Sequence, residues 1–206
     1  MEEELIIVID LDGTLISDGI SQKIYREAYI ETLKKMKERG IEIPDEFFSH
    51  SFENYCEISK RYEDFEKIYK SIYPIVLEKY IDDIGREEEK ARVIYYHLIY
   101  RYKPKSVFIL TANPKGDSII NKILSDIPRE NIIVVDGTKY VDDKKKVLEN
   151  LKSLGKVLYV ADRDDIDRQA ADKAGVDYIN INSIIEELKE RELYNPKILI
   201  ASRNKS

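Results

Sequence analysis

The clearest pattern along the chain is a set of short, continuous apolar runs that end at polar residues. The first is LIIVID at residues 5–10. Four later segments have the same character: residues 107–110, 132–135, 157–161 and 178–181. A continuous apolar run is expected for a strand that is buried on both faces of a parallel sheet. The pattern therefore predicts five buried strands.

Helix-favouring stretches lie between the later strands, at residues 117–125, 144–154 and 167–174. Gly175 follows the last of them and suits the position just after a helix end. Because strand and helix alternate, we expect an α/β fold with a doubly wound, Rossmann-like parallel sheet. Residues 198–201 near the end form either an extra edge strand or a frayed tail.

Residues 21–102 interrupt this rhythm, because they contain charged, helix-favouring segments and no buried strand. An apolar stripe predicts a first helix before Gly40, and Pro44 can start the next. The stripe consists of Ile24, Ala28, Leu33 and Met36. Further helices are expected at residues 52–62, 65–80 and 87–102, with Pro74 as a kink or a boundary. We expect a catalytic core at residues 1–17 and 103–206, and an inserted helical domain at residues 18–102.

Composition narrows the classes of partner. With 34 basic and 40 acidic side chains, the formal charge of −6 opposes binding to nucleic acid or to an anionic membrane. No apolar run approaches the roughly 20 residues that span a bilayer. The acidic start lacks the basic region of a signal peptide, so we expect a cytoplasmic protein. Charged residues at 36% and the absence of Trp hint at a thermophilic source.

Cysteine and histidine offer little chemistry here. The single Cys56 has no partner for a disulfide and is expected to be a small packed side chain. His50 and His97 lie in the helical stretch without the spacing of a metal pair, so we expect structural or surface roles.

Acidic side chains instead gather where the predicted strands end. Asp10 closes the first strand, and Asp12 follows two residues later, before Gly13. Asp162 closes the fourth strand and is followed by further acids at residues 164, 165 and 167. Ligands bind beyond the carboxyl ends of the strands in an open parallel sheet. Like charges brought together there need a cation between them, and oxygen-only ligands favour Mg²⁺.

A hydroxyl and an amine are expected at the same edge, from Thr111 at the end of the second strand and from Lys144. A carboxylate can attack phosphorus when a metal and a lysine neutralise the phosphoryl oxygens, and this gives an aspartyl-phosphate intermediate. A neighbouring Asp can protonate the leaving oxygen and later deprotonate water.

These residues resemble the four motifs of the haloacid dehalogenase superfamily, in the same order along the chain. DLDGT at residues 10–14 looks like the first motif, and ILTAN at residues 109–113 looks like the second. Lys144 in KKKVLENL is similar to the motif-three lysine, although Lys145 and Lys146 are alternatives. ADRDDID at residues 161–167 looks like the fourth motif, but with Ala161 where the family often has Gly, and with Arg163 where a small residue is common.

The resemblance implies Asp10 as the nucleophile and Asp12 as the acid and base. It implies that Mg²⁺ is held by Asp10, the Asp12 backbone carbonyl and Asp162, with Asp167, or its rival Asp165, completing the site. Thr111 and Lys144 would bind the phosphoryl oxygens. Ala112 and Asn113 would line the substrate site, although Asn113 before Pro114 is equally a turn signal.

Residues 18–102 are inserted where members of this superfamily carry a helical cap of the first type, and such caps close over a small substrate. Lys23 and Arg26 are candidates for contact with the distal part of the substrate, against the alternative of an ordinary basic helix surface. Four tyrosines form either an aromatic wall over a ligand or part of a core or interface: Tyr95, Tyr96, Tyr100 and Tyr102.

The function that these residues predict is a Mg²⁺-dependent phosphohydrolase acting on a small phosphorylated metabolite, such as a phosphoglycolate, a sugar phosphate or a nucleotide. Asp12 argues for phosphatase chemistry, since dehalogenase members lack an Asp at that position. The alternatives are a phosphotransferase or mutase, and a catalytically silent ligand-binding protein with this fold. We expect a monomer or a homodimer.

Overall fold

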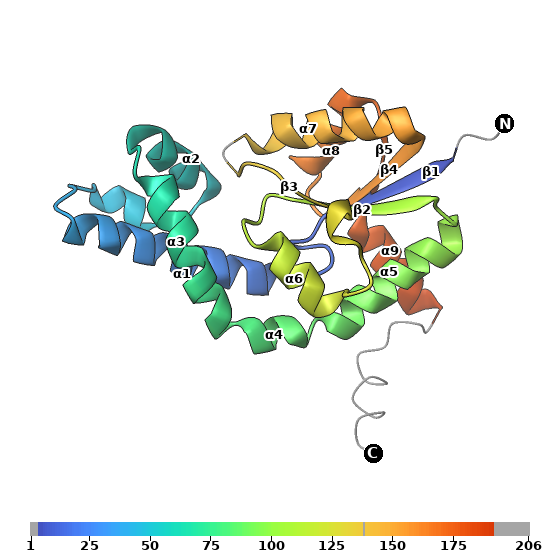
Figure 1. The fold of residues 1–206 in the computed structure, drawn as a ribbon, viewed down its shortest axis with the longest axis horizontal. Helices are drawn as coiled ribbons and strands as arrows, with labels where there is room; N and C mark the ends of the chain where they lie inside the picture. Colours follow the sequence, from blue (N-terminus) through green and yellow to red (C-terminus); the bar gives the residue numbers. More distant parts are fainter. Residues whose placement is uncertain (1–3, 138, 192–206) are drawn as a thin grey trace, which may run out of the picture.

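The computed structural model describes residues 4–137 and 139–191. Its sheet has five strands in the order β3-β2-β1-β4-β5, and every neighbouring pair is parallel. The predicted α/β fold with a parallel sheet is confirmed (Figure 1). Observed strands differ from the predicted runs by one residue at either end: β1 (Leu5–Ile9), β2 (Ser106–Thr111), β3 (Ile132–Val134), β4 (Lys156–Ala161) and β5 (Asp177–Asn180).

Alternate residues of the central strand face two separate cores. Ile6 and Val8 pack in a cluster with the side chains of α7 and α8, whereas Ile7 and Ile9 pack with those of α5, α6 and α9. Figure 1 shows these two helical layers above and below the sheet, so the sheet is doubly wound. The layers comprise α7 (Tyr140–Leu151) and α8 (Asp167–Ala174), and α5 (Glu88–Tyr102), α6 (Gly116–Ile123) and α9 (Ile181–Glu190).

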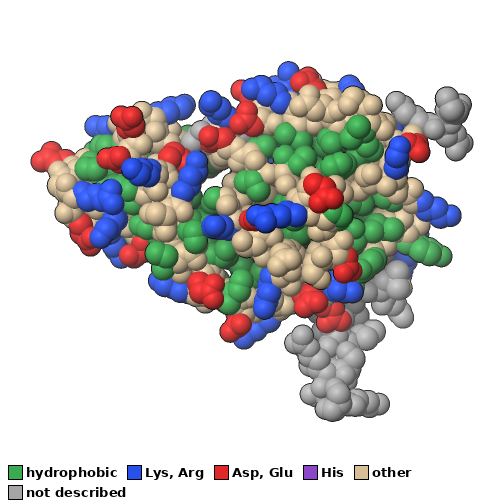
Figure 2. Space-filling view, viewed as in Figure 1, with side chains coloured by type: hydrophobic (Ala, Val, Ile, Leu, Met, Phe, Trp, Pro, Cys, Tyr) green, Lys and Arg blue, Asp and Glu red, His purple; other side chains and the backbone are tan. Residues whose placement is uncertain are grey.

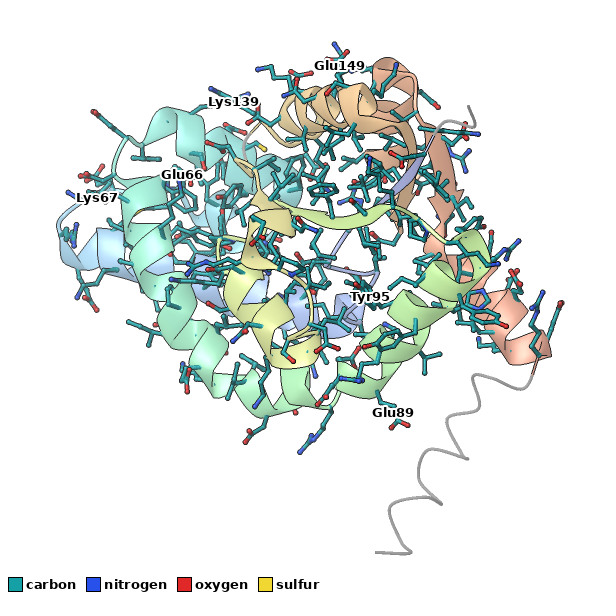
Figure 3. The ribbon with its side chains drawn as sticks, turned by 45° about the vertical axis from the view of Figure 1, so that its right-hand side comes forward. Glu66, Lys67, Glu89, Tyr95, Lys139 and Glu149 are labelled. Atoms are coloured by element: carbon teal, nitrogen blue, oxygen red, sulfur yellow. The ribbon has the colours of Figure 1, made fainter. Side chains whose placement is uncertain are left out.

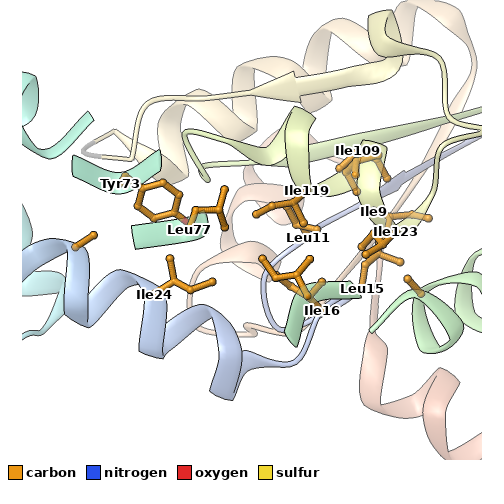
Figure 4. Packing of buried hydrophobic residues seen from close by; sticks show 14 of the residues in the cluster. Ile9, Leu11, Leu15, Ile16, Ile24, Tyr73, Leu77, Ile109, Ile119 and Ile123 are labelled. Carbon is orange, nitrogen blue, oxygen red and sulfur yellow. The ribbon is translucent and has the colours of Figure 1, made fainter. Parts of the chain in front are cut away.

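Every element between β1 and β2 is helical, as the sequence predicts. The predicted stripe of Ile24, Ala28, Leu33 and Met36 is fully buried. In Figure 4, Ile24 and Leu77 lie beside Leu11 and Ile16, so the core of these helices is continuous with the core under the sheet. The elements are α1 (Asp18–Glu38), η1 (Asp45–Phe48), α2 (Phe52–Arg61), α3 (Phe65–Lys79), α4 (Ile81–Gly85) and α5.

The last of these helices, α5, packs against the lower layer rather than with α1–α3. Arg101 forms an ion pair with Glu187 on α9, and His97 Nε2 lies 3.9 Å from Oε1 of the same residue. Tyr96 donates a hydrogen bond to Asp126, which follows α6. Residues 18–102 remain our predicted inserted domain, and we call them the helical insert below.

Three local features differ from the sequence prediction. Helix α7 begins four residues before Lys144. Asp142 and Asp143 lie in its first turn, where negative charges interact favourably with the positive end of the helix dipole and stabilise this start. Pro74 lies inside α3, which continues through it to Lys79, so the alternative that Pro74 is a helix boundary is wrong. Residues 81–85 form the separate short helix α4 between two longer ones. The possible strand at residues 198–201 lies outside the described part of the chain.

The path of the chain through the sheet creates one place where polar ends converge. From β1 in the middle, the chain moves outward through β2 and β3, then returns to β4 on the other side of β1. Such a reversal of strand order is where open α/β sheets bind ligands. Asp10 follows β1 and Asp162 follows β4, so both acids stand at this point.

Candidate functional site

Three carboxylates meet at the reversal point. One oxygen from each of Asp10, Asp162 and Asp167 lies within 4.8 Å of the other two. Asp10 is 3% exposed, and Asp167, which opens α8, is fully buried. All three were predicted from the sequence, and the structure brings them together.

The turn after β1 makes room for this cluster. Gly13 has a φ of +77°, a conformation that side chains other than that of glycine rarely adopt. A Cβ atom at Gly13 would lie 2.2 Å from Oδ2 of Asp162, which is closer than atoms can approach. Gly13 therefore serves both the backbone turn and the approach of Asp162.

Lys144 lies beneath the cluster and is fully buried. Its Nζ donates hydrogen bonds to Oδ1 of Asp10 at 2.9 Å and to Oδ1 of Asp167 at 2.8 Å. The neighbouring Lys145 and Lys146 instead pair with Glu149 and Asp143 on α7. Among these three lysines, Lys144 is therefore the one that the structure places in the site.

Tyr159 on β4 is a site residue that the sequence interpretation missed. Its hydroxyl accepts a hydrogen bond from Lys144 Nζ at 2.9 Å and donates one to Asp167 Oδ1 at 2.9 Å. A tyrosine in an otherwise aliphatic buried strand was the available signal, because a buried phenol needs a hydrogen-bond partner.

Asp12 is held by side chains from both parts of the molecule. Tyr25 on α1 donates its hydroxyl hydrogen to Oδ2 of Asp12 at 3.0 Å, and Asn113 Nδ2 donates to Oδ1 at 3.2 Å. The Thr111 hydroxyl lies 3.4 Å from Oδ2. Asn113 also forms the predicted turn, because its Oδ1 accepts the Lys115 amide at 3.0 Å. Tyr25 was not predicted.

The carboxyls of Asp10, Asp12 and Asp162 hold their protons more tightly than ordinary carboxyls. Burial raises the pKa of Asp10 well above its usual value; the Lys144 ammonium opposes this, and Asp167 and Asp12 add to it. Burial, with the negative charge of Asp167, raises the pKa of Asp162 to about 6. Burial also raises the pKa of Asp12, against the hydrogen bonds that it accepts. Negative charge is therefore in excess at this site.

Two carboxylate oxygens in the cluster point to a cation. Oδ1 of Asp162 and Oδ2 of Asp167 are buried and have no hydrogen-bond partner among the described residues. Buried polar atoms are normally satisfied, so an orphaned pair beside a third carboxylate fits a bound metal ion. Because all the donors are carboxylate oxygens, the set suits a hard ion such as Mg²⁺.

The rival acid lies away from the cluster. Asp165 is exposed and pairs with Arg163, with Oδ2 at 2.6 Å from Nη2. Asp164 accepts a hydrogen bond from Asn180 and pairs with Arg168. Asp167 is thus the acid after Asp162 that reaches Asp10.

A cavity of about 360 Å³ opens between the acids and the helical insert. Thr111, Asn113 and Lys144 lie behind its wall and are at most 1% exposed. The tyrosines considered from the sequence lie outside the lining, and Figure 3 shows Tyr95 on α5. Lys23 and Arg26 are exposed and also lie outside it. The lining comprises Asp10, Asp12, Asp18, Gln22, Tyr25, His50, Ser51, Phe52, Glu53, Tyr55, Tyr69, Ala112, Pro114, Gly137, Asp162 and Arg163.

On the face shown in Figure 2, basic and acidic side chains are interspersed rather than gathered by sign. This distribution gives no support for a polyanionic partner on that face. Among residues 4–137 and 139–191, no helix has the length and apolar character needed to cross a membrane.

Comparison with known proteins finds only distant structural likeness. No model of a protein family matches the chain, and no curated protein does. Among solved structures, the chain is similar to a hydrolase from Streptococcus pneumoniae TIGR4, with 19% sequence identity over 92% of this chain and 100% of that one. The TM-score is 0.40, and a likeness at this level carries no argument about activity.

Proposed function

We propose that this chain is a Mg²⁺-dependent phosphohydrolase of the haloacid dehalogenase type, which cleaves a small phosphate monoester through a phosphorylated Asp10. The observation that carries the proposal is the meeting of Asp10, Asp162 and Asp167 within 4.8 Å, with two orphaned carboxylate oxygens. A buried cluster of like charges costs stability, and binding of a cation offsets that cost.

Asp10, Asp162 and Asp167 are proposed to hold the metal, together with the Asp12 backbone carbonyl that the sequence resemblance implies. A bound Mg²⁺ supplies positive charge that neutralises the phosphoryl oxygens of the substrate. Lys144 adds a second positive charge from below and fixes Asp10 Oδ1 through its 2.9 Å hydrogen bond. The other oxygen of Asp10 is then the one that attacks.

The reaction we propose has two steps. A carboxylate oxygen of Asp10 forms a bond to phosphorus, and the bond from phosphorus to the leaving oxygen breaks while Asp12 gives that oxygen a proton. Asp12 then takes a proton from water, the water oxygen attacks phosphorus, and the acyl-phosphate bond breaks to release phosphate. The raised pKa of Asp12 suits an acid that must carry a proton at neutral pH.

The residues of the second motif, Thr111, Ala112 and Asn113, have different roles in this proposal. Thr111 and Asn113 contact Asp12 and hold its carboxyl in place. Thr111 and Lys144, which lie buried behind the cavity wall, are the residues proposed to stabilise the phosphoryl oxygens from beneath the site. Ala112 lines the cavity beside the substrate.

The helical insert is proposed to act as a cap over the core formed by residues 1–17 and 103–206. Its helices α1, α2 and α3 supply one side of the cavity wall, through residues such as Tyr25, Tyr55 and Tyr69. Closure of such a wall excludes water while the phosphoryl group is transferred.

The test is phosphate release from a panel of phosphate monoesters, with and without Mg²⁺. We expect metal-dependent release by the wild type, and none by Asp10→Asn, which keeps the size of the side chain but loses the nucleophile. Asp165→Asn, in an exposed acid outside the cluster, should retain activity. Lack of release from every ester by the folded, Mg²⁺-loaded wild type would refute the proposal. Transfer to an added alcohol without free phosphate would replace hydrolysis by phosphotransfer.

A further inference from the structure

The side of the cavity that the helical insert forms differs in character from the aspartate cluster. Rings of Tyr25, Tyr55 and Tyr69 line it, each from a different helix of the insert. Tyr55 and Tyr69 meet edge to face, with ring centroids 5.3 Å apart. Tyr69 continues into the buried Tyr73, with centroids 5.7 Å apart. These contacts fix the rings, so they form a firm apolar wall.

The charged side chains that line the cavity are mostly negative. Asp18 on α1 and Glu53 on α2 both line the cavity. The lining also contains Arg163, whose guanidinium is already engaged by Asp165 at 2.6 Å. His50 is a further lining residue, and burial, with Arg26 nearby, lowers its pKa below the usual value, which disfavours its charged form. Among the described residues of the lining, the positive charge of Arg163 is already paired with Asp165, so the wall disfavours a second anion on the substrate.

Uncharged polar groups complete the wall. Gln22 and Ser51 line the cavity beside the acids, and carboxylates, amides and hydroxyls all accept hydrogen bonds. A leaving group with hydroxyl or amine hydrogens can satisfy them. A carboxylate or a second phosphate on the substrate would meet the like charges of Asp18 and Glu53, which are exposed residues of the lining, and this repulsion disfavours a second anion.

We propose that the transferred phosphate is the substrate's only anionic group, and that the leaving alcohol is neutral or cationic, with a flat or apolar face that rests on the tyrosines. This inference rests on the proposed phosphohydrolase activity and narrows it. It favours monophosphates of ring-bearing or polyhydroxy alcohols and of amino alcohols. It excludes phosphocarboxylates such as phosphoglycolate, together with bisphosphates.

Three phenyl phosphate esters that differ in the charge of one ring substituent test the inference. Phenyl phosphate, 4-carboxyphenyl phosphate and 4-(aminomethyl)phenyl phosphate differ mainly in the charge at the far end of the ring. With the Mg²⁺-loaded wild type at pH 7.5, we expect kcat/KM for the carboxylated ester to be at least about tenfold below that of phenyl phosphate. The aminomethyl ester should equal or exceed phenyl phosphate.

Variants connect the preference to the wall. In Glu53→Gln and Asp18→Asn, the ratio of kcat/KM for the carboxylated ester to that for phenyl phosphate should rise several-fold. Glu57→Gln is the matched control, because Glu57 is exposed on the same helix α2 but lies outside the cavity lining. Its ratio should stay at the wild-type value. Thermal melts of all three variants show whether each is folded.

The outcomes separate the two proposals. If the carboxylated ester is hydrolysed as well as phenyl phosphate or better, or if neither wall variant changes the ratio, the inference about the leaving group is overturned while the hydrolase survives. If no ester, p-nitrophenyl phosphate included, is hydrolysed by the folded, Mg²⁺-loaded protein, the proposed function fails, and this inference fails with it.

Discussion

Tyr25 and Asp12 are joined by a 3.0 Å hydrogen bond from the phenol to Oδ2, so a residue of the helical insert holds the carboxyl that we propose as the acid and base. Asn113 holds the other oxygen of the same carboxyl from the core side. The orientation of Asp12 therefore depends on α1 being in place against the sheet edge. A change in the contact between the insert and the core would then directly alter the position of the Asp12 carboxyl.

We predict that Tyr25→Phe slows the steps that need proton transfer. Loss of one hydrogen bond to a carboxylate costs about 1.5–3 kcal/mol, which corresponds to about tenfold or more in kcat. The loss should fall on alkyl phosphates, whose leaving oxygen needs the proton. It should be small for p-nitrophenyl phosphate, whose phenolate leaves without one, and KM should change little for either ester.

Tyr29→Phe is the control for this variant, because Tyr29 lies on the same helix and loses a buried hydrogen bond to the Phe47 carbonyl. We expect it to lower the free energy of unfolding by about 1 kcal/mol. The ratio of the two ester rates should stay unchanged. An equal loss on both esters in Tyr25→Phe would assign Tyr25 a purely structural role.

The carboxylate cluster predicts which acids respond to metal. Mg²⁺ at about 100 times its Kd should stabilise the wild type by about 2.7 kcal/mol, which is a rise of several degrees in Tm. Asp162→Asn and Asp167→Asn should lose this rise, whereas Asp165→Asn should keep it, because Asp165 pairs with Arg163 outside the cluster. Differential scanning calorimetry with and without Mg²⁺ measures each shift. A normal shift in Asp162→Asn would place the metal elsewhere.

Gly13 and Gly40 form a matched pair for testing the close approach to Asp162. Both have positive φ, +77° and +82°, but a Cβ at Gly40 would meet open space. Gly40→Ala should therefore show backbone strain alone, a loss of about 1 kcal/mol in the free energy of unfolding. Gly13→Ala adds a clash with the Asp162 carboxylate, so it should lose more stability and nearly all Mg²⁺-dependent activity. Urea denaturation and phosphate release measure the two effects, and equal losses in both variants would contradict the steric account.

Removal of the buried lysine should be costly. Lys144→Met leaves Asp10 and Asp167 without their shared ammonium, and breaking a buried pair from one side typically costs about 3–5 kcal/mol. Lys145→Met removes an i,i+4 surface pair with Glu149 and should stay within about 0.5 kcal/mol of the wild type. The double variant Lys144→Met/Asp167→Asn should recover part of the loss, since one uncompensated charge is gone. An additive double variant in urea denaturation would show that the pair is not coupled.

The sheet could be predicted because β1 to β4 are apolar along most of their length, which is a signal that needs no tertiary information. β5 gives a weaker signal, since Tyr178 and Ile179 lie between two polar residues. The predicted ends of helices and strands were less accurate where contacts with distant parts of the chain decide where an element begins or ends. Helix α7 starts four residues before its predicted start at Lys144. Helix α3 ends within one residue of its predicted end at residue 80, and it continues through Pro74 because packing in the insert offsets the missing hydrogen bond. Such compensation comes from neighbours that are distant in the sequence.

The candidate site likewise contains residues that the sequence could predict and residues that it could not. Asp10, Asp12 and Asp162 could be found because strand ends in a parallel sheet share one edge. Choosing Asp167 over Asp165 required the structure, since both are near the start of one helix and only the observed turn buries the former. Tyr25, Tyr55 and Tyr69 could not be assigned from the sequence, because their meeting depends on how three helices pack over the sheet edge.

The pairing of β1 with β4 also has a consequence for folding. Ile7 lies opposite Val107 on β2 and opposite Leu158 on β4, so the first strand of the chain must wait for its second partner, which comes about 150 residues later. Contacts that close so long a loop form slowly and late. Asp10 leaves the ribosome early, but its partners Asp162 and Asp167 emerge only with β4 and α8. A growing chain therefore carries an incomplete cluster until most of the protein has been made, and recovery of metal affinity would mark the end of folding rather than its beginning.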